Sequence, residues 1–155
     1  MLERIISGGQ TGADRAALDA ALAGGFPHGG WCPRGRLAED GPIDGRYQLS
    51  ETEDASYPVR TECNVRDSDG TVILTLVVLG GGSALTADFA RRHRKPWLHL
   101  RLDEMEDAGA VERLREFIHG NGIRTLNVAG SRASTEPGIY ERCRAIVAAV
   151  LAPQA

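Results

Sequence analysis

The stretch "IISGGQTGADRAALDAAL" (Ile5–Leu22) decides the expected fold. An apolar run comes first, a turn with glycines at positions 8, 9 and 12 follows, and an alanine-rich segment with helical spacing comes last. A glycine turn between a strand and a helix is a common anion-binding element, because the helix N-terminus carries unpaired N–H groups and a positive dipole. The stretch therefore predicts a strand–turn–helix unit that can hold a phosphate on its backbone.

The same pattern continues along the chain. "TVILTLVVL" (Thr71–Leu79) lacks polar alternation, which is typical of a strand buried on both faces in the centre of a parallel sheet. Alternating strands and helices require parallel pairing. We predict an α/β fold with one domain over residues 1–155, a three-layer, Rossmann-like, doubly wound and mainly parallel sheet, and ligands at the carboxyl ends of its strands. The expected strands are 2–7, 71–79, 96–100 and 125–129, with a short one near 30–32, and the expected helices are 13–23, 57–66, 84–93, 104–119 and 137–151.

Composition excludes several classes of protein. A length of 155 residues suits one domain, and a net charge of −3 argues against a nucleic-acid partner. No apolar run is long enough to span a membrane, and the N-terminus lacks the pattern of a signal peptide. Cys32, Cys63 and Cys143 are scattered without metal-ligand spacing, so we expect reduced thiols, no metal site and a cytoplasmic location.

Three predicted strands end in small-residue turns: "SGGQTGAD", "LGGGSALTAD" and "VAGSRAS". In a parallel sheet all three turns lie along one edge, where the hydroxyls of Thr11, Ser83, Thr86 and Ser131 would add donors to the backbone amides. The turns do not match the standard phosphate motifs. A P-loop would need Lys and a hydroxyl residue after Gly12, and the dinucleotide fingerprint would need a glycine at position 7. We therefore reject an ATPase and disfavour NAD.

Asp14 and a few arginines are the charged candidates for this edge. Asp14 lies in the first helical turn, where it would favour the dipole, accept from a ribose or a ring N–H group of the ligand, or meet a cation. Arg34, Arg36 and Arg132 are candidate anion clamps, or else solvated side chains. We expect Gly9 to lie at the surface, facing the ligand. No pairing of a nucleophile with a base is visible, so no catalytic residue is assigned.

Five blocks resemble the putative molybdenum carrier family, a branch of the SLOG group of Rossmann-like proteins. They are "GGQTGADRAALDAA", "GGWCPRGRLAEDGPI", "RTECNVRDSDGTVIL", "GGGSALTADFARRHRKP" and "LNVAGSRASTEPGIY". The resemblance implies a homo-oligomer, specifically a tetramer, and molybdenum cofactor (molybdopterin) as ligand. The alanine-rich "AALDAALAGG" and "AIVAAVLA" could bury a second face in such an assembly. The ligand residues implied by the resemblance are Gly8, Gly9, Gln10, Thr11, Gly12, Asp14, Arg34, Gly81, Gly82, Ser83, Thr86, Ser131 and Arg132.

Residues and resemblance together predict a binding or carrier protein rather than an enzyme. Its expected partner is a small phosphorylated heterocycle, either the molybdenum cofactor or a related pterin or nucleotide. The alternatives are a nucleotide-sensing module and a LOG-type phosphoribohydrolase. The motif of those hydrolases is Pro-Gly-Gly-x-Gly-Thr followed by a glutamate, whereas this chain has "GGGSALTAD" with only Asp88 as an acid.

Overall fold

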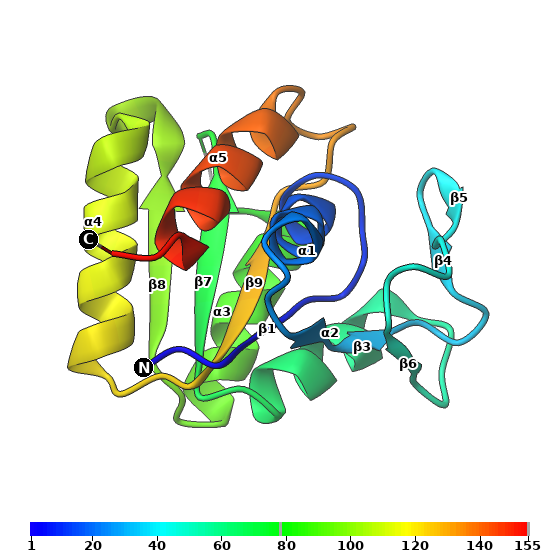
Figure 1. The fold of residues 1–155 in the computed structure, drawn as a ribbon. Coiled ribbons are helices and arrows are strands. Elements are labelled where there is room, and N and C mark those ends of the chain that lie inside the picture. The colour runs from blue at the N-terminus through cyan, green and yellow to red at the C-terminus, as the bar shows by residue number, and fades with distance from the viewer. Residues whose placement is uncertain (78, 155) are drawn as a thin grey trace.

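A five-stranded parallel sheet forms the centre of the computed structural model, which describes residues 1–77 and 79–154 (Figure 1). Every pair of adjacent strands in this sheet is parallel. The topology confirms the prediction of a parallel α/β sheet. In spatial order the strands are β2 (His28–Gly29), β1 (Arg4–Ile6), β9 (Thr125–Gly130), β7 (Gly70–Thr75) and β8 (Trp97–Arg101).

Helices cover both faces of the sheet and complete the predicted three layers. Figure 1 shows one group in front of the sheet, made of α1 (Ala13–Ala23), α4 (Asp107–Gly120) and α5 (Ile139–Leu151). The helices α2 (Tyr57–Arg66) and α3 (Gly81–Arg92) lie behind it and pack against each other. No helix among the described residues is long and apolar enough to cross a membrane.

The strand β7 is buried along its whole length, as the unbroken apolar run predicted. It is not the central strand, however, because β9 lies between it and β1. It also ends at Thr75 rather than Leu79, and Val78 lies outside the described residues. The strand stops there because the N–H groups of Leu76 and Val77 donate to the Glu136 carboxylate and not to a neighbouring strand. A short 3-10 helix (Leu102–Glu104) follows β8, so α4 begins at Asp107.

The helices α1 and α5 pack closely against each other over the sheet. Alanines on α1 give α5 room to approach, and the contact belongs to the main hydrophobic core. The two alanine-rich stretches considered for an oligomer interface therefore contact each other within one chain, while Ala145 and Ala148 stay exposed. The core residues of this contact include Ala16, Ala17, Ala20, Ile139, Cys143 and Ile146.

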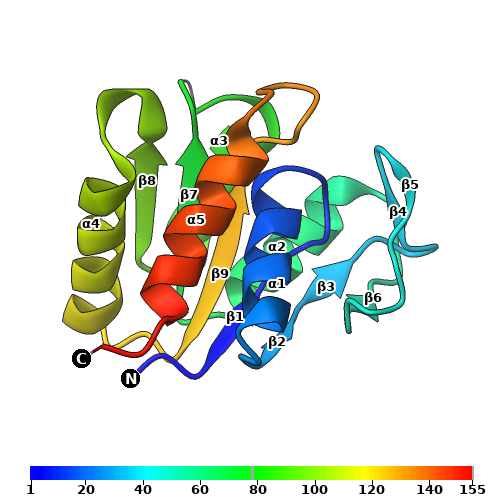
Figure 2. The same ribbon diagram turned by 45° about the horizontal axis from the view of Figure 1, so that its top comes forward.

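An inserted segment, residues 30–51, lies beside the sheet as an arm (Figure 2). The sequence predicted mostly ordered loop here, and the structure adds two small pairings. Parallel β3 (Trp31–Cys32) and β6 (Ser50–Glu51) form one, and antiparallel β4 (Leu37–Ala38) and β5 (Gly41–Pro42) form the other. We call residues 37–42 the hairpin. A small second core anchors the arm to α1, with Leu18, Cys32, Ala38, Ile43 and Tyr47.

Candidate functional site

A groove of about 720 Å³ lies at the carboxyl ends of β1, β7 and β9. The turns after all three strands contribute to it, as the sequence predicted, and α2 supplies a further wall. The expected ligand residues that line it are Gly8, Gln10, Asp14, Gly81, Gly82, Ser83, Thr86, Ser131 and Arg132.

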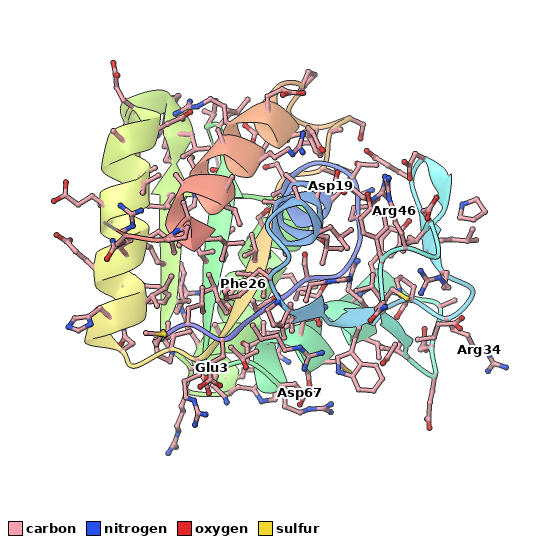
Figure 3. All side chains as sticks on the ribbon, viewed as in Figure 1. Glu3, Asp19, Phe26, Arg34, Arg46 and Asp67 are labelled. Atoms are coloured by element: carbon pink, nitrogen blue, oxygen red, sulfur yellow. The ribbon has the colours of Figure 1, made fainter. Side chains whose placement is uncertain are left out.

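Four expected ligand residues do not line the groove: Gly9, Thr11, Gly12 and Arg34. Gly9 is buried against the arm, since a β-carbon there would lie 2.8 Å from Leu49 Cδ1. Gly12 packs on the turn after β9, where a β-carbon would overlap the carbonyl oxygen of Ser131. Arg34 is exposed, and Figure 3 shows it on the outer side of the arm, pointing away from the sheet.

Thr11 instead helps to hold the hairpin. Its hydroxyl donates to Glu39, and the Glu39 carboxylate also accepts from the backbone N–H (3.2 Å) and hydroxyl (2.6 Å) of Ser134. These hydrogen bonds, from Ser134 first and Thr11 second, lower the pKa of Glu39. Asp40 adds an ion pair with Arg15 at 3.0 Å. Part of the turn after β9 is thus bound by a carboxylate of the chain itself.

Asp14 and Arg60 are buried together in the groove. The Asp14 carboxylate accepts from the Gln10 N–H at 3.3 Å and lies 3.8 Å from the Arg60 guanidinium. Arg60 in turn donates to the Gly8 carbonyl at 2.8 Å. Burial raises the pKa of Asp14, and the positive charge of Arg60 opposes that shift. A ligand entering the groove therefore meets both a donor-rich cation and a desolvated acceptor.

Tyr57 lies beside two guanidinium groups in the wall of the groove. The Cζ atoms of Arg60 and Arg132 lie 5.2 and 5.4 Å from its ring centroid, within the range of cation–π contacts. All three residues line the groove, so two positive charges stand next to an aromatic ring. This arrangement suits an anionic ligand that carries a planar ring.

Sequence reasoning missed the contribution of α2, although it predicted the bounds of this helix correctly. Tyr57, Arg60 and Asn64 line the groove. Their spacing of three and four residues places them on one helix face. This spacing could have identified them as a group from the sequence. The amide of Asn64 also fixes the arm, since it accepts from the N–H of Trp31 and donates to its carbonyl.

The hydroxyls predicted as ligand donors are mostly engaged within the chain. Ser131 donates to the Glu136 carboxylate, which also accepts from the two backbone N–H groups that end β7. Thr86 donates to the Gly82 carbonyl at 2.9 Å, one turn earlier in its own helix. Both residues line the groove, but their hydroxyl hydrogens already form hydrogen bonds within the chain.

Gln10 differs from these residues because half of its amide is unpaired. Its Oε1 accepts from the N–H of Thr11 at 3.0 Å and from the N–H of Glu39 at 2.9 Å. Gln10 is among the residues that line the groove, and the residue is 6% exposed. Within residues 1–77 and 79–154, its Nε2 has no hydrogen-bond partner.

Asp88, the only acid in the third turn and its helix start, is not part of this arrangement. It is exposed on α3 and pairs with Arg91 at 2.8 Å. In the part of the chain that the structure describes, no three His, Cys, Asp or Glu side chains group as metal ligands.

The comparisons with known proteins agree with the fold. One similar solved structure is the crystal structure of a putative molybdenum carrier protein from Syntrophus aciditrophicus SB, with 47% sequence identity and a TM-score of 0.95. The match covers 97% of this chain and 96% of that chain. No curated protein matches. The model of the circularly permutated YpsA SLOG family matches residues 5–151, and the chain therefore belongs to this family.

Proposed function

We propose that this protein binds and carries a small phosphorylated heterocycle, and that the ligand is the molybdenum cofactor. The observation that carries the proposal is the groove at the sheet edge, where three strand-ending turns meet Arg60, Arg132 and the ring of Tyr57. Helix N-termini and guanidinium groups favour a phosphate, and an aromatic ring favours a planar heterocycle. The name of the Syntrophus protein supports molybdenum-related cargo.

The size of the groove favours the whole cofactor over free molybdate. A volume of about 720 Å³ lies within the usual range of small-molecule sites, roughly 300–1,000 Å³. One helix N-terminus could hold a bare oxyanion, which would leave most of the groove unused. Asp14 supplies an acceptor and Arg60 a donor, which fits a ligand with both N–H groups and anionic oxygens.

Titration calorimetry with both ligands tests the proposal. We expect tight binding of the cofactor and weak binding of molybdate to the natural protein. Asp14→Asn should weaken cofactor binding by about 10- to 100-fold, because a bond to a charged group contributes roughly 1.5–3 kcal/mol. The same change should leave molybdate binding equal or stronger, since it removes a repulsive charge. Equal affinity for the cofactor and molybdate would refute recognition of the pterin.

The mass and metal content of material that co-purifies with the protein provide a second test. We expect a phosphorylated pterin with molybdenum in near-equal amounts. A nucleotide without metal would favour the sensing module instead.

The phosphoribohydrolase alternative would require an acid at the substrate. Asp88 lies outside the groove lining, paired with Arg91. We expect no release of adenine from adenosine monophosphate by the purified protein. Sustained release that is abolished by Asp88→Asn would contradict the carrier proposal.

We also propose a homo-oligomer, specifically a tetramer, in a reducing compartment such as the cytoplasm. The resemblance supports the assembly, whereas the α1–α5 packing no longer does, because it is internal. Cys32, Cys63 and Cys143 are free thiols, as a reducing compartment requires. Light scattering at micromolar concentration checks the assembly, and a mass equal to one chain would contradict it.

A further inference from the structure

We propose that Glu39 is an internal competitor for anionic ligands: its carboxylate fills an oxyanion subsite at the turn after β9, and the phosphate of a bound ligand displaces it and frees the tip of the hairpin (residues 39–41). This inference rests on the proposed function and adds a regulatory step to the same groove. The donors around Glu39, the position of Arg132 and the anchoring of the hairpin support it.

Four donor groups from two turns meet at the Glu39 carboxylate. One oxygen accepts from the Thr11 hydroxyl and from the Ser134 N–H at 3.2 Å, and the other accepts from the Ser134 hydroxyl at 2.6 Å. The Arg132 guanidinium lies 3.8 Å from this second oxygen. Carboxylate and phosphate oxygens accept from the same kinds of donor, and guanidinium groups pair with both. Glu39 therefore stands where the oxygens of an anionic ligand would find the same partners.

Arg132 connects this subsite to the groove. It lines the groove, and its Cζ lies 5.4 Å from the Tyr57 ring centroid, while the same guanidinium pairs with Glu39. A ligand phosphate that enters beside Tyr57 therefore competes with Glu39 for one cation. A phosphate monoester carries about 1.5 to 2 negative charges near neutral pH and three terminal oxygens, whereas a carboxylate has one charge and two oxygens. The phosphate is the stronger partner for Arg132 and for the Ser134 donors in the same turn.

The tip of the hairpin is held by polar contacts, whereas its root is held by the second core. Besides its carboxylate, Glu39 uses its N–H to donate to Gln10 Oε1 at 2.9 Å. Asp40 pairs with Arg15 at 3.0 Å. Both Glu39 and Asp40 are exposed, whereas Ala38 at the root is buried in the second core. Exposed ion pairs contribute little to stability, so these contacts open more easily than apolar packing does. Loss of the Glu39 contacts therefore frees the tip and leaves the rest of the arm in place.

An NMR titration of the protein with inorganic phosphate tests the competition, with the Ser134 amide resonance as the probe of the subsite and chloride to keep the ionic strength constant. We expect phosphate to bind Glu39→Gln about 10-fold more tightly than the natural protein, because the neutral amide competes less well for these donors. Unchanged or weaker phosphate binding by Glu39→Gln would overturn the inference, and so would a Ser134 resonance that phosphate shifts in neither protein.

Asp40→Asn is the matched control. It removes one negative charge from the same tip and weakens the contact with Arg15, but it leaves Glu39 on its donors. We expect this variant to bind phosphate as the natural protein does. Equal tightening by Asp40→Asn and Glu39→Gln would show that a lower overall charge or a looser tip is responsible, and it would overturn the competition.

Hydrogen exchange in the natural protein provides a measurement without a variant. The ligand is molybdenum cofactor released anaerobically from a molybdoenzyme. At saturation we expect the hairpin amides to exchange faster and those of α2 to exchange more slowly, because the ligand replaces Glu39 and covers α2. Unchanged or slower exchange of the hairpin with bound cofactor would overturn the inference. If the natural protein does not bind the cofactor, the proposed function fails, and the phosphate titration still decides the role of Glu39.

Discussion

Asp14 makes the stability of this protein depend on pH in an unusual direction for a carboxylate. Burial raises its folded-state pKa above the ordinary value near 4, despite the nearby Arg60. At a pH between the ordinary pKa and the raised folded-state pKa, Asp14 is protonated in the folded chain and deprotonated in the unfolded chain. The contribution of Asp14 to stability therefore falls as pH rises through this window, and then stays constant.

We predict that Asp14→Asn removes this pH dependence. The unfolding free energy of the natural protein, relative to that of the variant, should decline as pH rises from about 4 and then level off. Urea denaturation at a series of pH values measures the difference. A relative stability that increases with pH would mean that pairing with Arg60 outweighs desolvation.

Gly12 carries a separate prediction about the turn. Its φ of 79° lies in the left-handed region, and a β-carbon would overlap the backbone of the turn after β9. We predict that Gly12→Ala destabilises the fold by more than the roughly 1–3 kcal/mol of backbone strain alone. Gly45→Ala is the matched control, because nothing lies within 4 Å of a β-carbon there. Similar denaturation midpoints for the two variants would contradict this.

At this scale the sequence predicted which turns meet at the groove better than it predicted the contacts of their residues. Asp14, Gln10 and Arg132 line the groove as expected, because turns that follow parallel strands must meet at one edge. Gly9 and Thr11 serve the arm instead, and the arm's path depends on contacts between residues distant in the sequence. Local pattern cannot show which partner a hydroxyl or a glycine will meet.

At the scale of elements, one carboxylate joins the hairpin (residues 37–42) to two turns at the sheet edge. Glu39 bonds to Thr11 and Ser134, from the turns after β1 and β9, and these hydrogen bonds lower its pKa. A depressed pKa means a stabilising contribution that is present above the ordinary value and is lost as pH falls through the folded value.

We predict that Glu39→Gln speeds the exchange of hairpin amide hydrogens near neutral pH, because the amide keeps an acceptor but loses the charge. The difference from the natural protein should shrink in acid, where Glu39 itself is protonated. Hydrogen-exchange mass spectrometry measures it. Glu53→Gln, at an exposed position between the arm and α2, should change nothing. Equal protection of the hairpin amides in Glu39→Gln and in the natural protein at neutral pH would show that the charge of Glu39 does not stabilise the hairpin.

Elements with a strong local signal were predicted accurately, and elements defined by distant contacts were not. The expected bounds of α2 agree with the structure, and those of α1 do as well. Helix spacing and glycine or proline punctuation are local features, so the sequence displays them. The place of β9 between β1 and β7 cannot be predicted from local sequence, because an apolar strand has the same sequence pattern at any interior position of a sheet.

At the scale of the whole molecule, a ligand that spans the groove should stabilise the fold. The groove walls come from the turns after β1, β7 and β9 and from α2, so a bound ligand contacts the folded state alone. We predict that cofactor at about 100 times its Kd adds about 2.7 kcal/mol to the unfolding free energy. Thermal denaturation with increasing cofactor checks this, and an unchanged Tm would show that the cofactor does not bind the folded chain.

The position of β9 has a consequence for how the chain is made. The pairs β1–β2 and β7–β8 consist of segments synthesised early, but only β9 joins them, pairing Ile5 with Leu126 on one side and Val72 with Val128 on the other. Until about residue 130 has left the ribosome, each half sheet exposes an unpaired edge that can capture another chain. Nascent chains stopped before β9 should therefore depend on chaperones, and the groove is completed only in the last stage of synthesis.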